Sequence, residues 1–485
     1  MYSLSHRLVQ IKGIQSPVTK ESTLKTEQRS VLLMVLPNAL AVPIMLSSVN
    51  VALPDIASDL NLSAVAVSWV PTVFLMASAM FVLIFGRVAD MFGRKKVFLI
   101  GAVTVIVSSL MASMAGDSSQ LLVARFLQGF GAAMLYATQM ALISSVFPPQ
   151  ARGRAIGWVI SLIYVGLAVG PLLGGVITEY FGWRPTFYLQ IPLAFAVLYI
   201  GLFKVKKEWS AEERGSFDVI GAGLYAGSIA LICLGSAYMP QGFALLIFIG
   251  GITGVLVFFS YARRAEQPLW NVTLFFTNRL FTFSCMASLI IYSATFMNVV
   301  LVSLYLQYIQ GMPAMLAGAV MMVQPLVMAI LSPLVGRYAD QLEPRWLASS
   351  GMLITAVGLL ALASLGSDDS LPRIILALFI TGFGFSLFST PNVNAMMGSV
   401  ENRFLGAASS AVAITRILGQ MASMVLVTLL FAIFVGDLPF SPDNFSLLAS
   451  TIRTAFYLAA LLCLPGLIFS LSRGETARPR ELKSG

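Results

Sequence analysis

The sequence is poor in the residues that bind metals or form disulfides. Among its 485 residues there are one histidine and three cysteines. The histidine, His6, lies before the first long apolar segment, which excludes a histidine proton relay or a His-ligated metal site inside a membrane. Cys233, Cys285 and Cys463 lie in separate apolar segments without paired spacing, as is typical of small packing residues. We therefore expect neither a metal nor a cofactor. The sequence also lacks a nucleotide-binding loop or a nucleophile–base set that would indicate an enzyme.

Acidic residues are missing from the interior of every long apolar segment. All 21 Asp and Glu residues lie in connecting segments, in the tails or at segment ends, among them Asp55, Asp59, Asp218 and Glu266. Proton-coupled transport normally uses a group that changes its charge as it is exposed to either side, and a carboxylate is the usual choice. Whether any transport is coupled to protons therefore stays open. Asp55 and Asp90, at the ends of apolar segments, are the carboxylates that would replace the missing interior one.

Apolar residues dominate the composition. At 58% hydrophobic and 11% charged, the chain has too little polar surface to coat a soluble globule, so lipid must be its solvent. A helix needs about 20 mostly apolar residues to cross a bilayer. Fourteen segments meet this requirement: 31–53, 66–85, 97–115, 120–146, 155–178, 185–203, 219–238, 243–261, 280–307, 314–335, 346–365, 374–398, 405–435 and 449–472.

The 30 basic residues test this number of spans. With the N-terminus in the cytoplasm, 25 lie in cytoplasmic tails and connections, Arg184 and Arg373 lie outside, and Arg125, Arg416 and Arg453 lie within spans. This asymmetry predicts that both termini are cytoplasmic, in a bacterial inner membrane. The net charge of +9 is spread over these connections, so it indicates topology and not nucleic-acid binding. The first 30 residues lack the apolar core of a cleavable signal peptide, and we expect a solvated tail.

A short sequence recurs in the second half of the chain. Residues 86–90 read Gly-Arg-Val-Ala-Asp, and residues 336–340 read Gly-Arg-Tyr-Ala-Asp. Both copies lie in short charged segments between predicted spans, so the chain contains two related halves. Two related halves in a membrane suggest a transporter in which one half rocks against the other around a central site.

Three motifs lie in or beside the spans of the first half. Residues 86–96 combine glycines, which let helix ends approach closely, with Asp90, which can pair with a cation or a helix N-terminus. Arg125, in span four, costs about 2.5–3.5 kcal/mol near a membrane centre, so it should face protein or a wet cavity, or else snorkel outward. Residues 166–175 of span five place small residues at four-residue spacing around Pro171, which predicts a close-packed, bent helix.

These motifs resemble those of the major facilitator superfamily. The inserted spans 219–238 and 243–261, with the sequence Asn-Val-Ala-Leu-Pro at 50–54, are similar to the drug:proton antiporter family with fourteen transmembrane helices. The resemblance implies an all-α membrane fold of two six-helix bundles plus two inserted helices. The implied parts are a cytoplasmic tail (1–30), an N-terminal six-helix bundle (31–203), a linker with two extra spans (204–279), a C-terminal six-helix bundle (280–472) and a cytoplasmic tail (473–485).

The resemblance also implies gating and coupling residues. Asp90, Arg94 and Lys95 would latch the cytoplasmic side closed, and Pro171 with its glycines would form a hinge. The full implied set is Gly86, Asp90, Gly93, Arg94, Lys95, Arg125, Gln128, Gly129, Gly166, Gly170, Pro171, Gly174, Gly175, Asp340 and Arg416. The alternatives are a solvated loop that only sets topology, an arginine that snorkels, and glycines that serve packing alone.

The chain departs from the family in its first span. Family members usually carry an acidic residue a few positions before residues 50–54, and Met45 lies nearest that place here. Arg416, near the middle of span thirteen, has no buried acid to pair with, so it would contact a ligand or gate, or be satisfied by structural hydrogen bonds. Export of a monovalent cation against an inside-negative potential costs about 2.3 kcal/mol per 100 mV, whereas an anion gains this energy. These features favour neutral or anionic cargo.

We expect polar and aromatic side chains from both halves to line a central cavity. The candidates are Asn50, Tyr136, Gln139, Tyr164, Asn298, Gln307, Gln324, Asn392, Asn394 and Gln420. Each can instead be a hydrogen bond between helices. The sequence predicts a monomeric secondary exporter of small amphipathic molecules that works by alternating access. The alternatives are a transporter or exchanger of organic anions or lipid-like molecules that is not driven by protons, and a non-transporting scaffold or sensor.

Overall fold

The computed structural model describes residues 17–210, 216–270, 272–339, 343–366, 369–400 and 405–474. Within these ranges the chain is helical, and the one extended contact is an isolated bridge between Ser63 and Pro439. Fourteen helical segments of these ranges are long and apolar enough to cross a membrane, which confirms the predicted number of spans. Asp340 and most of both predicted tails lie outside the described residues.

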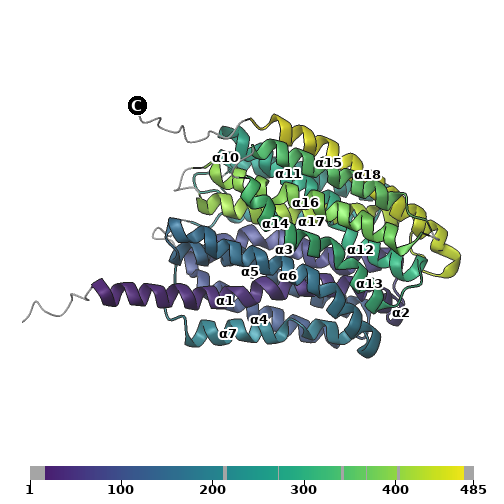
Figure 1. Ribbon diagram of the computed structural model, residues 1–485, viewed down its shortest axis with the longest axis horizontal. Helices are drawn as coiled ribbons and strands as arrows, with labels where there is room; N and C mark the ends of the chain where they lie inside the picture. The colour runs from purple at the N-terminus through teal and green to yellow at the C-terminus, as the bar shows by residue number, and fades with distance from the viewer. Residues whose placement is uncertain are drawn as a thin grey trace, which may run out of the picture.

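The first six spans form one bundle (Figure 1). They are α1 (Pro17–Val51), α3 (Ala64–Phe92), α4 (Arg94–Ser113), α5 (Ser118–Val146), α6 (Pro149–Phe181) and α7 (Ile191–Phe203), with the short elements α2 (Leu53–Asp59) and η1 (Arg184–Tyr188). Side-chain caps start two of the helices, because Ser63 accepts from the Ala66 N–H and Asp117 from the Gln120 N–H. Within the bundle, α1 packs on α6, and α3 and α4 pack on α5.

The last six spans form the second bundle. They are α11 (Arg279–Thr295) with α12 (Met297–Leu304) and η2 (Tyr305–Ile309), α13 (Ala314–Met321) with α14 (Val323–Ala339), α15 (Pro344–Ala363), α16 (Leu371–Gly398), α17 (Leu405–Phe434), and α18 (Phe445–Ser472) after the short η4 (Pro442–Asn444). The inserted pair, α8 (Val219–Ala237) and α9 (Gly242–Ala262), lies between the bundles in sequence, and α10 (Thr273–Thr277) leads into α11.

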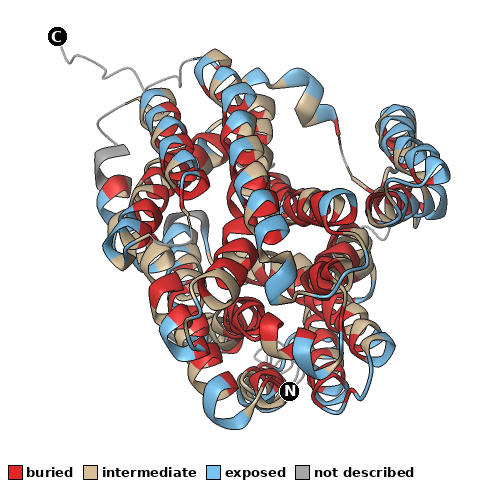
Figure 2. Cartoon of the chain, turned by 90° about the vertical axis from the view of Figure 1, so that its right-hand side faces the viewer, coloured by how far each residue is buried: buried red, intermediate tan, exposed pale blue. Residues whose placement is uncertain are grey.

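Apolar side chains cover the outside of the molecule as well as its interior. Buried residues gather between the helices and exposed ones face outward (Figure 2). On α9, Leu246 is 72% exposed and Leu256 64%. Large apolar side chains are stable in such positions when lipid, and not water, surrounds them.

Several helix ends and breaks differ from the sequence prediction. Span nine is broken at Phe296 and ends in the π-helical turn η2, and span ten is broken at Met322. Pro171, by contrast, lies inside the continuous helix α6. The charged segment 86–96 is not an extended loop, since α3 continues to Phe92, α4 begins at Arg94, and a single glycine separates them. The limits of the five predicted parts stay a prediction.

The two faces of the molecule are distinguished by the chain ends. We call the face where α1 begins and α18 ends the terminal face, which lies on the left in Figure 1, and the opposite one the distal face. α2, η1 and η4 all lie at the distal face, between successive spans.

Candidate functional site

A small cavity of about 90 Å³ lies between the two bundles. Its wall is mostly apolar and includes Pro171 with three of the predicted polar candidates, Asn298, Gln324 and Gln420. Asn298 donates to Gln324 Oε1 at 3.3 Å, and its own amide oxygen is buried without a partner among the described residues. A few amides in an apolar wall are typical of a small-molecule site. Drug-sized ligands need about 300 Å³ or more, so the cavity in this structure is too small for one.

Aromatic residues of the C-terminal bundle complete this cavity. Tyr292, Phe296 and Phe385 line it, and the rings of Tyr292 and Phe385 are 5.4 Å apart. Sequence reasoning missed all three. The chain has 33 phenylalanines and 14 tyrosines, and no local motif distinguishes the few that face the cavity from those that face lipid.

Arg416 lies one turn from Gln420 on α17 and faces the other bundle. Its guanidinium carbon is 5.6 Å from the ring centre of Tyr136 on α5. Tyr164 of α6 is close enough to interact electrostatically with Arg416, and its hydroxyl lies 3.1 Å from Ser389 Oγ on α16. The half-buried guanidinium has no hydrogen bond or ion pair within the part of the chain that the structure describes. Among the described residues it is therefore a cation without a counter-ion between the bundles.

The two bundles are joined at the distal face. Gln307 Nε2 donates to the Val51 carbonyl at 2.9 Å, and the Tyr308 hydroxyl donates to the Pro54 carbonyl at 3.4 Å. Asn50, beside Val51, is 1% exposed, and neither atom of its amide has a partner among the described residues. These contacts close the distal side of the cavity.

The small residues of α6 permit two close helix contacts. Three of the predicted glycines face α1: Gly166, Gly170 and Gly174. A Cβ on Gly170 would lie 1.9 Å from Ser47 Oγ, and one on Gly175 would lie 2.3 Å from the Ala314 carbonyl oxygen on α13 of the other bundle. The motif therefore serves packing within the N-terminal bundle and also the seal between the bundles.

Arg125 is completely buried, so the alternative of an outward-snorkelling side chain is wrong. Its Nε donates to the Val70 carbonyl at 3.0 Å, and its Nη1 donates to Gln128 Oε1 at 2.6 Å. Nη1 also lies 3.0 Å from Met45 Sδ, and the guanidinium carbon is 4.8 Å from the centre of the Phe74 ring. Sulfur is a weak acceptor. The residue at the place of the family's acid thus contacts the arginine without balancing its charge.

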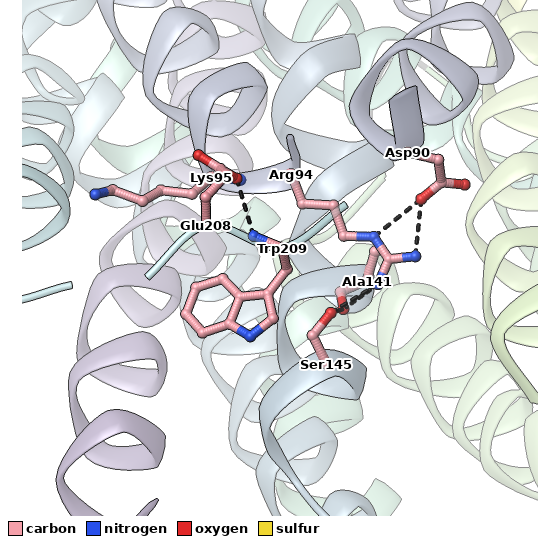
Figure 3. Close-up of polar contacts among 7 residues, drawn as sticks. All are labelled: Asp90, Arg94, Lys95, Ala141, Ser145, Glu208 and Trp209. Carbon is pink, nitrogen blue, oxygen red and sulfur yellow. Dashed lines mark hydrogen bonds and ion pairs between the residues drawn. The ribbon is translucent and has the colours of Figure 1, made fainter. Parts of the chain in front are cut away.

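Asp90 and Arg94 form an ion pair at the junction of α3 and α4 (Figure 3). Arg94 donates to Asp90 Oδ1 from Nε at 2.9 Å and from Nη2 at 2.8 Å, and its Nη1 donates to Ser145 Oγ of α5 at 2.6 Å. The Asp90 side chain is 37% exposed, and this pair lies wholly within the N-terminal bundle. A Cβ on Gly86 would meet nothing within 4 Å, so the expected close helix approach does not involve Gly86.

Three predicted cavity residues lie elsewhere. Gln139 accepts from Asn38 Nδ2 at 2.5 Å inside the N-terminal bundle, and Asn394 is exposed. Asn392 accepts from Arg473 Nη1 at 2.8 Å inside the C-terminal bundle. Arg473, which the sequence analysis assigns to the cytoplasmic C-terminal tail, is only 2% exposed. α18 ends at Ser472, at the predicted limit of the last span, and the side chain of the next residue points inward to Asn392.

Two carboxylates at the distal face have shifted pKa values. Burial, and then the charge of Asp59, raise the pKa of Asp55 above its usual value. Hydrogen bonds from Trp183 and Arg184 lower the pKa of Asp59, which accepts from Arg184 Nη1 at 2.8 Å. Both acids lie outside the predicted spans, at the rim that the bundles seal.

Two six-helix bundles and an inserted pair of spans, with a mostly apolar cavity that contains a few amides between the bundles, define a polytopic membrane transporter. The chain belongs to the Major Facilitator Superfamily, whose sequence profile matches residues 35–266 and 283–485. Members of this family are transporters and not enzymes, as the sequence predicts.

Relatives and solved structures agree with this assignment. The chain is 29% identical to the riboflavin transporter RibZ of Clostridioides difficile, over 88% of this chain and 93% of that protein. It is 28% identical to the multidrug resistance protein Stp of Mycobacterium tuberculosis (77% and 70%) and 25% identical to the tetracenomycin C resistance and export protein of Streptomyces glaucescens (88% and 80%). A crystal structure of a POT peptide transporter with alafosfalin superposes with a TM-score of 0.67 at 15% identity (92% and 97%), which shows the fold alone.

Proposed function

We propose that the chain is a secondary exporter of small amphipathic molecules that works by alternating access. The observation that carries the proposal is the cavity between the bundles, with amides in an apolar wall and a hydrogen-bonded seal on its distal side. A site between two rigid bundles that is closed on one side opens to the other when the bundles rock. The names of the relatives, a riboflavin transporter and two drug-resistance proteins, support small organic cargo.

The terminal face is assigned to the cytoplasm of a bacterial inner membrane, because the basic residues gather on that side. In this orientation the structure is closed toward the outside. Asp90 pairs here with Arg94 of its own bundle. We assign to Asp90 a second contact, with the C-terminal bundle, when the terminal face closes, which makes it the latch of that face. The transporter is taken to act as a monomer, since each chain contains a complete pair of bundles.

The cargo is assigned as neutral or anionic. Arg416 holds a positive charge between the bundles without a counter-ion among the described residues. A cationic cargo would be repelled by this charge, and an anionic group would be attracted to it at short range in a medium of low dielectric constant. The three tyrosines around the arginine, Tyr136, Tyr164 and Tyr292, provide flat surfaces and hydroxyl groups for an aromatic cargo.

A second candidate is an exchanger of organic anions that is not driven by protons. It is favoured by the contact of Arg125 with the sulfur of Met45 in place of a carboxylate. Without an acid in the bundle interior, proton transfer would depend on rim residues such as Asp55 or Asp90.

Flux measurements in sealed proteoliposomes test both candidates. Riboflavin and an anionic aromatic dye serve as probe cargoes, and the pH gradient is collapsed while the electrical potential is kept. We expect flux to continue under this condition. One proton taken up for each exported molecule would contradict proton-independent transport. Strict dependence on a counter-anion would select the exchanger, and no flux of any compound in a broad screen would overturn both candidates.

A further inference from the structure

The segment after α7 binds the junction between α3 and α4 (Figure 3). Glu208 Oε1 accepts from the backbone N–H of Lys95 at 2.8 Å, and the Trp209 carbonyl accepts from the backbone N–H of Arg94 at 2.8 Å. The Trp209 N–H also donates to Glu208 Oε1, at 3.2 Å. The side chain that completes the start of α4 therefore comes from the connection to the inserted pair.

The start of α4 needs such a partner for two reasons. The N-cap residue is Gly93, which has no side chain to cap the free N–H groups of the first turn. The first turn is also strongly positive, since residues 94–96 are Arg, Lys and Lys at the positive end of the helix dipole. A carboxylate there satisfies an N–H group and offsets this charge.

Gly93 and Glu208 are matched in shape as well. Gly93 has φ +119°, a conformation that other residues rarely adopt, and a Cβ at this position would lie 2.6 Å from Glu208 Cδ. The glycine of the motif is thus required both by its backbone conformation and by the space that the Glu208 carboxylate occupies.

A second set of contacts holds the opposite flank of the junction. Arg87 Nη2 donates to the Ser216 carbonyl at 3.1 Å and to Gln267 Oε1 at 3.4 Å. Gln267 Oε1 also accepts from the Ser216 N–H at 2.6 Å, which joins the entry and the exit of the inserted pair. α8 in turn packs against α3 of one bundle and α17 of the other.

We propose that Glu208 is a positioning residue of the gate. Together with Trp209, Ser216 and Gln267 it forms a linker clamp that holds the junction of α3 and α4. The clamp places the Arg94 backbone so that its side chain reaches Asp90 and Ser145 at once, and it couples the inserted pair α8–α9 to the latch. The inference rests on the gating role proposed above for Asp90.

Amide hydrogen exchange of the purified full-length protein tests the clamp without any cargo. The variants are Glu208→Ala, which removes the cap, and Glu208→Gln, which keeps an oxygen acceptor but not the charge. Glu266→Ala is the matched control, because Glu266 is an exposed acid on the connection at the other end of the inserted pair. We expect the exchange rate of the amides of residues 94–97 to rise about tenfold in Glu208→Ala, because the helix loses its cap. The rise should be smaller in Glu208→Gln and absent in the control. Equal exchange in Glu208→Ala and the control overturns the clamp.

Transport by the same variants tests its coupling to the gate. We expect Glu208→Ala to lower turnover about tenfold. The cargo concentration that gives half-maximal transport should stay within about twofold of the wild-type value, because the cap positions the gate and not the cargo site. Glu208→Gln should recover part of the turnover. Faster exchange with normal turnover would overturn the coupling to the gate. A wild type that transports no probe cargo would refute the proposed function, while the exchange result would still decide the clamp.

Discussion

Arg125 is a buried cation whose contacts among the described residues include no acidic side chain. The guanidinium is 0% exposed and is satisfied by a backbone carbonyl, an amide, an aromatic face and the sulfur of Met45. Neutral acceptors and a ring face can stabilise a buried guanidinium, but their protonation does not change during a transport cycle. An acidic side chain at position 45 would make this site titratable, but the chain has Met45 there.

Replacing Met45 with Asp should restore such a titratable site. The new carboxylate would lie beside the Arg125 guanidinium, and its charge would depend on exposure and on pH. We expect flux through Met45→Asp to become dependent on the pH gradient, as measured in proteoliposomes with the potential clamped. Met45→Asn, of nearly equal size but without a charge, is the control. The same response to the pH gradient in both variants would contradict this role.

Arg416 should determine the preference for cargo charge. Arg416→Gln removes the unpaired cation between the bundles, so we expect about tenfold weaker binding of an anionic dye, as for loss of one charge-assisted contact, and little change for a neutral cargo. Arg416→Lys keeps the charge but loses the planar set of donors. Its affinity for the anionic dye should therefore lie between that of the wild type and that of Arg416→Gln. Binding measured by fluorescence quenching checks this order. Equal losses for neutral and anionic cargo would show that Arg416 is structural.

Asp55 and Asp59 should give opposite pH dependences of stability. The pKa of Asp55 is raised by burial, so the folded protein holds this proton more tightly than the unfolded chain, and stability falls as pH rises from about 4 through the raised value. The pKa of Asp59 is lowered by Trp183 and Arg184, so its contribution is present above about pH 4 and is lost as pH falls.

Melting temperatures in detergent between pH 3 and pH 8 test these signs, with the range chosen to bracket the reference pKa of about 4. Asp55→Asn should melt higher than the wild type at neutral pH, whereas Asp59→Asn should melt lower. Asp437→Asn, an exposed acid at the same face, should leave the melting temperature unchanged. A melting temperature of Asp55→Asn below that of the wild type at neutral pH would contradict the raised pKa of Asp55.

At the scale of a helix, α6 combines two kinds of contact along one line of small residues. Gly170 meets α1 of the same bundle, and Gly175 meets α13 of the other bundle. α6 is continuous through Pro171, so both contacts lie on one unbroken helix. Its partners in the other bundle, α13 and α14, are separated at Met322, and Met321 and Gln324 beside this break line the cavity.

The contact of Gly170 with α1 should be sensitive to a single methyl group. A Cβ there would lie 1.9 Å from Ser47 Oγ, so we expect Gly170→Ala to destabilise the protein by about 1–3 kcal/mol, as for overpacking. Adding Ser47→Ala should recover part of this loss, since it removes the clashing oxygen. Gly157→Ala, on the same helix with nothing within 4 Å, is the control and should be neutral. Thermal unfolding of the wild type, the three single variants Gly170→Ala, Ser47→Ala and Gly157→Ala, and the double variant measures the effect. Full additivity of the two substitutions would refute the contact.

At the scale of the whole molecule, the distal seal should have to open in every cycle. Ser63 and Pro439 pair in an isolated antiparallel bridge between the bundles, a separation that suits a disulfide. We expect Ser63→Cys with Pro439→Cys to lose transport on oxidation and regain it with reductant, while each single variant stays active. The natural cysteines are buried and should not interfere. Normal flux by the fully oxidised double variant would show that this seal does not gate transport.

The sequence alone was sufficient for the number and order of the spans, because apolar length is a local property. It also predicted that Arg125 faces protein or a wet cavity unless it snorkels outward, since the cost of a buried charge applies wherever the helix packs, and it placed Met45 where family members usually carry an acid. Only the structure shows that these two residues are in contact. Asn298, Gln324 and Gln420, which line the cavity, were among ten polar candidates. The sequence placed each candidate in a span but did not show toward which neighbour its side chain points.

Tertiary structure decided which of these side chains meet. Gln139 and Asn392 hydrogen-bond within their own bundles, while Gln420 faces the cavity, because the rotation of each helix depends on packing with partners far away in sequence. Glu208 reaches Gly93 for the same reason: α4 lacks a capping side chain of its own, and only the path of the linker across the terminal face supplies one. Such contacts join residues 81, 101 and 113 positions apart, and no local pattern in the chain encodes them.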